Sequence, residues 1–204
     1  MKNLLEYFLR DEPAGFRWAA MPATCTDTDG SLCVVPPPHS DFICEPGTGR
    51  KKLDASILET RIGGDFIARA RVRPDFSSPG NAAGILIYSD DDNWARICFE
   101  RDEQGRAAVT TVVTRDGVSD IASAPAAEDE SVWLQLIRCG PLFDMQRSGD
   151  GMAFERIRRF STAAPFMLSL GLVVLCPNAA QASHHFDFWG LMESASEMVA
   201  GMGE

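Results

Sequence analysis

Apolar and polar side chains alternate along several short segments of the chain, most clearly from Phe66 to Val72. The apolar residues at positions 66, 68, 70 and 72 share one face, while Ile67, Arg69 and Arg71 share the other. A period of two residues is typical of a β-strand with one buried face and one wetter face. This segment is therefore predicted to be a strand that covers part of a core.

Further segments of strand length follow, separated by glycine, proline, aspartate or asparagine. Strands are expected over residues 32–35, 41–44, 56–62, 83–88, 94–100, 107–114, 133–138, 143–147, 152–157, 167–176 and 185–191. Hairpin turns are expected around Gly105 and from Ser148 to Gly151. Residues 45–56 and 122–130 are expected to be loops, residues 1–10 a helical turn or irregular arm, and residues 192–204 a frayed tail or short helix.

Many short strands at regular spacing, without a long segment of helical period, indicate an all-β protein. The predicted fold is an antiparallel β-sandwich of the jelly-roll type. A chain of 204 residues suits one large all-β domain. We expect a single domain over residues 1–204, with a core at about 15–191 and terminal extensions at 1–14 and 192–204.

Charge and cysteine usage narrow the range of partners. The formal net charge is −10, so neither nucleic acid nor an anionic membrane surface is expected as a partner, because both need a surplus of Lys and Arg. Residues 1–11 lack the apolar core of an export signal, and no stretch reaches the ~18 apolar residues of a membrane-spanning helix. We therefore expect a cytoplasmic protein whose six cysteines are reduced thiols.

An ordered series of motifs in the middle of the chain resembles a known family. The motifs are Phe16-Arg17-Trp18, Asp65 to Ala68, Ala83 to Ile87, Asp92 to Glu100, Val112 to Asp120 and Ser148 to Gly151. Over roughly residues 15–191 they resemble the uncharacterised family typified by the regulation-of-enolase protein. That family belongs to the concanavalin A-like lectin/glucanase superfamily. The resemblance implies a jelly roll of two curved sheets, with ligands often on the concave sheet.

Two positions depart from the family pattern. Ile121 stands where the family usually has a tryptophan after the Ser-Asp pair. Tyr88 stands where the family usually has a basic residue at the end of the Ala-Gly strand. Both positions are expected near the concave face, so a ligand preference does not transfer from the family to this chain.

The strand predicted over residues 94–100 supplies the candidate site. Trp94, Arg96 and Glu100 alternate with apolar residues, so they are expected on the face opposite the core. An aromatic platform, a fork of donors and an acceptor would suit a polar ring such as a sugar. The alternative is an ion-pair network of Arg96 and Glu100 over a packed tryptophan. Neighbouring strands are expected to add Tyr88, Thr114, Arg115 and Asp120.

Three other groups have both a functional and a structural interpretation. Asp120 could bond a ligand or position Arg96, or it could cap a turn. The acidic run at residues 90–93 could offer oxygen ligands to calcium, but a solvated acidic turn is the favoured interpretation. His184 and His185 could be metal or acid–base residues, but adjacent strand residues point to opposite faces, which favours a structural role. No metal and no cofactor is expected.

Signatures of catalysis are mostly absent from the sequence. The Glu-x-Asp-x-Glu strand of the superfamily's glucanases is missing, as are G-x-S-x-G, H-E-x-x-H and a phosphate-binding glycine loop. The expected function is non-catalytic binding of a carbohydrate or small polar ligand on the concave sheet. The alternatives are a glycan hydrolase or lyase that uses Glu100 and Asp120, with catalytic residues otherwise unknown, and a metabolic regulator that acts through a protein partner.

Overall fold

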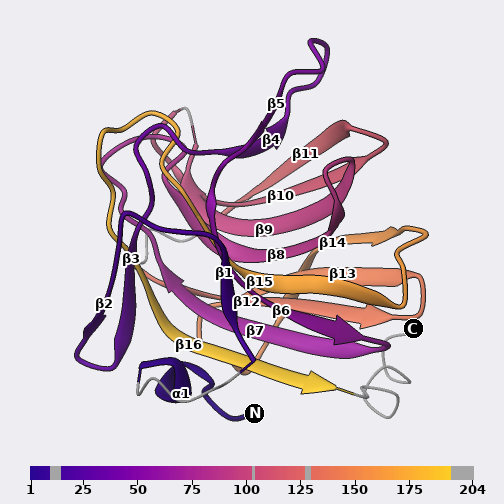
Figure 1. Ribbon diagram of the computed structural model, residues 1–204, viewed down its shortest axis with the longest axis horizontal. Helices are drawn as coiled ribbons and strands as arrows, with labels where there is room; N and C mark the ends of the chain where they lie inside the picture. The colour runs from indigo at the N-terminus through magenta and orange to yellow at the C-terminus, as the bar shows by residue number, and fades with distance from the viewer. Residues whose placement is uncertain (10–14, 103, 127–129, 194–204) are drawn as a thin grey trace.

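The computed structural model describes residues 1–9, 15–102, 104–126 and 130–193, which form two packed antiparallel sheets (Figure 1). Sheet A has the strand order β1 (Arg17–Ala20), β6 (Ser56–Gly63), β15 (Met167–Leu175), β8 (Ala82–Asp90), β9 (Asn93–Arg101), β10 (Ala107–Arg115) and β11 (Val118–Pro125). Sheet B has the order β14 (Glu155–Ser161), β13 (Leu142–Ser148), β12 (Val132–Cys139), β7 (Phe66–Arg73), β16 (His184–Glu193), β3 (Ser31–Val35) and β2 (Thr24–Thr28). One short helix, α1 (Leu5–Leu9), precedes them.

The core lies between the two sheets, because each central strand turns one face inward. On β9 the inward residues are Ala95, Ile97 and Phe99, which are at most 1% exposed. Sheet B contributes Phe66 and Leu134, among others, to the same cluster. The all-β sandwich predicted from the alternation is therefore confirmed. Among the described helices, none is long and apolar enough to cross a membrane.

Several element boundaries differ from the prediction. The segment 45–56, expected to be a loop, contains β5 (Lys51–Leu53), and 122–130 includes the end of β11. Strand β2 was not predicted, since its sequence TCTDT has no apolar alternation and its residues are mostly exposed. These are edge or isolated strands, where hydrogen bonding to a neighbour rather than burial of a face defines the strand. Residues 194–204, expected to form a tail, lie outside the described residues.

A β-bulge changes the face pattern of β16. Simple alternation puts Phe186 and Phe188 on one face, but the register with β7 shifts between these two residues. As a result Phe186 and Trp189 enter the core, and Phe188 packs against Trp133 outside it, with ring centroids 5.0 Å apart. An extra residue in one strand is the usual cause of such a reversal.

A two-stranded hairpin forms no strand pairing with either sheet. Strands β4 (Phe42–Cys44) and β5 pair with each other, and Figure 1 shows them beyond the β11 side of sheet A. The base of the hairpin is closed by the carbonyl of Asp41, which accepts hydrogen bonds from the amides of Asp54 and Ala55, both at 3.0 Å. We call residues 41–54 the arm.

Candidate functional site

The arm packs on the face of sheet A that points away from the core, which we call the outer face. A second hydrophobic cluster forms there, separate from the main core. Its centre is the pair Phe42 and Trp94, whose ring centroids are 4.8 Å apart with an interplanar angle of 73°. On the β11 side, the amide of Cys44 donates to Ser119 Oγ at 3.1 Å. The arm thus lies across the outer face and leaves a groove on each side.

The groove on the β1 and β6 side has a volume of about 370 Å³. Its apolar surface comes from Ile57 and Leu86 of sheet A and from Phe42 and Leu53 of the arm. Tyr88 and the polar side chains of β1, β6 and β15 complete it. We call it the Tyr88 groove; it is lined by Arg17, Ala19, Ala20, Phe42, Leu53, Ile57, Glu59, Arg61, Leu86, Tyr88, Asp91 and Ser169.

Polar groups of both signs meet in the Tyr88 groove. Glu59 is only 6% exposed, and its Oε1 accepts a hydrogen bond from Arg17 Nη2 at 2.6 Å. Arg61 makes long contacts with Ser169 Oγ at 3.5 Å and with the carbonyl of Met167 at 3.4 Å. These long bonds leave its guanidinium free to donate elsewhere.

The tyrosine hydroxyl is held in its protonated, donating state. Tyr88 donates to Asp91 Oδ1 at 2.5 Å. Burial and this carboxylate raise the pKa of Tyr88 well above its usual range. An apolar floor with a neutral phenol, a buried carboxylate and a forked donor around it can hold a ring that carries hydroxyl groups.

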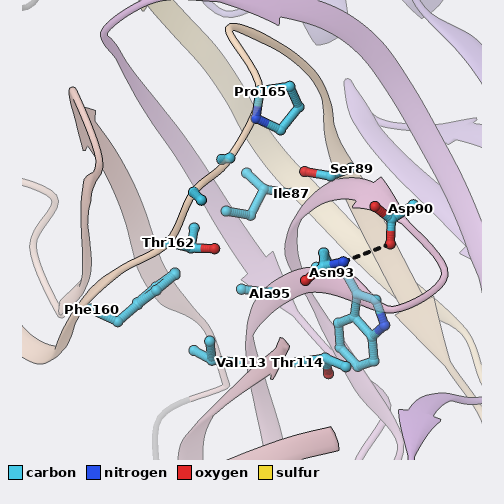
Figure 2. Close-up of a pocket in the computed structure, with 13 residues that line it drawn as sticks. Ile87, Ser89, Asp90, Asn93, Ala95, Val113, Thr114, Phe160, Thr162 and Pro165 are labelled. Atoms are coloured by element: carbon cyan, nitrogen blue, oxygen red, sulfur yellow. Dashed lines mark hydrogen bonds between the residues drawn. The ribbon is translucent and has the colours of Figure 1, made fainter. Parts of the chain in front are cut away.

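Two other hollows are less suited to such a ligand. On the other side of the arm, a wider groove of about 510 Å³ is lined mainly by residues of the arm and of the loop at 177–178. At one end of the sandwich, a pocket of about 270 Å³ lies between the β8–β9 turn and the segment 160–165 (Figure 2). Asp90 and Asn93 at that pocket bond each other at 3.0 Å, and its deeper residues Ile87, Ala95 and Val113 belong to the core.

Trp94, Arg96 and Glu100 lie on the face of β9 that points away from the core, as predicted. That face was expected to be open to solvent, but it is covered. Trp94 is 3% exposed and Arg96 is 6% exposed, because the arm covers them. Arg96 Nε donates to the carbonyl of Phe42 at 3.1 Å, while Arg96 Nη1 and Trp94 Nε1 are buried without a hydrogen-bond partner among the described residues. Burial also raises the pKa of Glu100, although Arg96 opposes that effect.

The neighbouring residues divide between the two faces of sheet A. Tyr88 lies on the outer face, and so does Thr114, whose hydroxyl is 2.7 Å from that of Ser119. Arg115 and Asp120 point to the opposite face, toward β14, where Arg115 Nη2 donates to the carbonyl of Ser161 at 3.1 Å. They therefore do not join Arg96, contrary to the prediction.

The carboxylates of Glu100 and Asp120 do not form a pair. Register across β9, β10 and β11 aligns Arg96 with Val112 and Ile121, so Asp120, opposite Val113, lies on the inward face. Asp120 forms a salt bridge with Arg158 at 2.5 Å. This carboxylate therefore neither positions Arg96 nor caps the turn, which were two of its predicted roles. A hydrolase that uses these two residues is excluded by the geometry, since its two carboxyl groups must flank one bond.

Sequence reasoning missed the side chains of the Tyr88 groove on β1, β6 and β15. Glu59 and Arg61 alternate with Leu58 and Ile62, so their position on a polar face could have been found. Their closeness to Tyr88 depends on β15, which lies between β6 and β8 in the sheet although it follows both in sequence. No local signal reports such long-range strand order.

The remaining candidate groups have structural contacts. Asp90 Oδ1 accepts from the amide of Asp92 at 2.9 Å and so closes the acidic turn. His184 is fully buried, and its Nδ1 accepts a hydrogen bond from the amide of Asp75 at 3.4 Å. Burial lowers the pKa of His184 to about 4. Within the described ranges, no group of three or more His, Cys, Asp or Glu side chains could hold a metal ion.

Proteins of known structure share this two-sheet architecture. A functionally unknown protein from Saccharomyces cerevisiae superposes with a TM-score of 0.81 at 22% identity, covering 88% of this chain and 96% of that one. The carbohydrate-binding module CBM66 from Bacillus subtilis has a TM-score of 0.58 at 16% identity, covering 88% and 96%. The GH43 protein BlXynB from Bacillus licheniformis reaches 0.71 at 14% identity, but this chain spans only 37% of it. These likenesses define a β-sandwich class.

Within that class, the chain belongs to the family described as Protein of unknown function (DUF1349), whose model matches residues 18–194. A curated relative is Regulation of enolase protein 1 from Saccharomyces cerevisiae, strain ATCC 204508 / S288c. It is 25% identical over 179 residues, which cover 85% of this chain and 87% of the relative. The family predicted from the motifs is therefore confirmed.

Proposed function

We propose that the protein is a non-catalytic binding module that holds a carbohydrate or a similar small polar ligand in the Tyr88 groove. The observation that carries this proposal is the convergence of Glu59, Arg61 and Tyr88 on an apolar floor beside the arm. Sugar rings present apolar C–H faces together with hydroxyl groups that both donate and accept. A buried acceptor, a forked donor and an aromatic wall match both features.

The comparison with CBM66 supports binding rather than hydrolysis. That carbohydrate-binding module matches this chain over nearly its whole length, whereas the chain spans about a third of the GH43 enzymes. Inside the Tyr88 groove, the carboxylates of Glu59 and Asp91 are both engaged, one by Arg17 and the other by Tyr88. A glycoside hydrolase would need a carboxyl group that is free to protonate the leaving group, and both of these carboxylates are already engaged.

A regulator acting through protein contacts is the alternative, and it rests on the name of the yeast relative, Regulation of enolase protein 1. The two functions are compatible, because a ligand in the Tyr88 groove would touch the arm as well as the sheet. Sedimentation of the protein with purified enolase, with and without a sugar, would separate them. A complex that forms without any ligand would favour the regulator.

A thermal-shift screen with neutral and acidic mono- and oligosaccharides tests the proposed function. A sugar at 100 times its Kd should raise the free energy of unfolding by about 2.7 kcal/mol, a shift of roughly 5–10 °C at this size. The variant Tyr88→Ala should lose that shift. Thr162→Ala, which changes the end pocket of Figure 2, should keep it. If no sugar shifts the wild-type midpoint, the proposed function is wrong.

A further inference from the structure

Phe42 contacts the outer face in the way that a bound ligand would. Its ring packs edge-on against Trp94 at 4.8 Å and against Tyr88 at 6.3 Å. Its carbonyl oxygen accepts the hydrogen bond of Arg96 Nε at 3.1 Å. The arm thus offers an apolar ring to an aromatic platform and an oxygen acceptor to a guanidinium, which together are the recognition features of a sugar ring.

Two buried donors on the strand that the arm covers are left unsatisfied. Arg96 Nη1 and Trp94 Nε1 are both buried, and neither has a hydrogen-bond partner among the described residues. Buried polar groups are normally paired, so two orphaned donors on one strand face need an explanation. A ring with several hydroxyl oxygens could satisfy both donors, whereas the phenyl ring of Phe42 cannot satisfy either. The closed arm is therefore a poorer partner for this floor than a sugar would be.

The attachment of the arm allows it to separate from the sheet without disrupting either sandwich layer. In the described part of the chain, β4 and β5 pair only with each other. Beyond the Phe42 contacts, the arm is tied to sheet A by Leu53 and by the buried Cys44, which pack in the same cluster. The amide of Cys44 donates to Ser119 and its thiol to the carbonyl of Asp91 at 3.8 Å, and Lys51 forms an ion pair with Asp92. Segments with few such ties are the ones that open locally at free energies below that of global unfolding.

We propose that the arm is a displaceable cover, and that the outer face beneath it is a second, enclosed part of the sugar site. When the arm lifts, a sugar ring takes the place of Phe42 against Trp94, and its oxygens accept hydrogen bonds from Arg96. Phe42 also lines the Tyr88 groove, so a ring bound there already touches the cover. This inference rests on the proposed function. It adds that binding competes with Phe42, so the closed arm lowers the apparent affinity.

The thiol of Cys98 reports the opening without any ligand. Cys98 lies on the outer face in the cluster under the arm and is fully buried. Val109 is equally buried but faces the core between the sheets, so a Val109→Cys thiol should react only on global unfolding. The experiment treats the native protein with a thiol reagent and measures labelling at each site by peptide mapping. We expect Cys98 to react at least tenfold faster than the thiol of Val109→Cys.

Removal of the Phe42 side chain should raise the rate at Cys98 further. Phe42→Ala should speed labelling of Cys98 at least tenfold more. It also lowers the free energy of unfolding, so the Val109→Cys thiol should react faster too, but still at least tenfold more slowly than Cys98 in the same variant. The milder Phe42→Leu should give smaller increases at both sites. Equal rates at the two sites would mean that the arm opens only when the whole domain unfolds, and the cover would then be disproved.

The sugar part of the inference has its own readout. For each sugar found by the thermal-shift screen, Phe42→Ala should bind at least threefold more tightly than wild type in a calorimetric titration. Weaker or equal binding would mean that Phe42 only lines the Tyr88 groove, and the claim that a sugar competes with Phe42 would be wrong. If neither protein binds any sugar while Cys98 still labels fast, the cover stands and both the sugar site and the proposed function fail.

Discussion

Replacing Glu59 by glutamine is expected to weaken ligand binding by about 10- to 100-fold, because the change removes the charge of the buried acceptor in the Tyr88 groove. Hydrogen bonds to charged groups contribute about 1.5–3 kcal/mol, and each 1.4 kcal/mol is tenfold in Kd. Glutamine keeps the length and shape of the side chain, so the groove should persist. The loss of the salt bridge to Arg17 should cost little stability, since Arg17 is 71% exposed.

The matched control for this variant is Glu45→Gln. Glu45 is an exposed carboxylate on the arm, and it lines the wider groove on the other side. Calorimetric titration of both variants with the same sugar should show a loss of affinity only for Glu59→Gln. A loss confined to Glu45→Gln would move the ligand to the wider groove and contradict the proposed site.

Replacing Gly84 by alanine is expected to lower the free energy of unfolding by more than about 3 kcal/mol. A Cβ atom at this position would lie 2.0 Å from the carbonyl oxygen of Ile97 and 2.7 Å from the Cα of Cys98. Both are backbone atoms of the neighbouring strand β9, so no side-chain rotation can relieve the clash. The strand that carries Trp94 and Arg96 would have to move, and the floor of the outer face with it.

Gly149→Ala provides the comparison for the glycine variant. Gly149 lies in the exposed β13–β14 turn, and a Cβ there would meet nothing within 4 Å. Urea unfolding followed by tryptophan fluorescence should place this variant within about 0.5 kcal/mol of wild type. If Gly84→Ala were equally mild, the close approach of β8 and β9 under the outer face would be wrong.

Local periodicity predicted most of the sandwich because burial on one face leaves a signal in every central strand. The alternation from Trp94 to Glu100 correctly placed the apolar residues inward and Arg96 outward. The bulge in β16 broke the same rule, since one inserted residue reverses all the side chains beyond it. Exposed edge strands such as β2 carry no burial signal and were missed for that reason.

The site was harder to predict than the fold because it is assembled from distant segments. Glu59, Arg61 and Ser169 reach Tyr88 only through the insertion of β15 between β6 and β8. The arm, at residues 41–54, covers Arg96, which lies 54 positions after Phe42 in the chain, and nothing in the composition of the arm indicates that contact. Arg115 and Asp120 lie on the same face of sheet A because of the turn between β10 and β11. The strand predicted over residues 107–114 ended before this turn, so the prediction could not place either side chain on that face.

Amide chemical-shift mapping during a sugar titration tests the central claim most directly, and a chain of 22.3 kDa is small enough for it. The structure predicts that the largest shifts fall on β6, β8, β15 and the arm, around Glu59, Tyr88 and Phe42. Shifts confined to sheet B, or to the end pocket near Thr162, would show that the ligand binds elsewhere and that the outer face of sheet A is not the site.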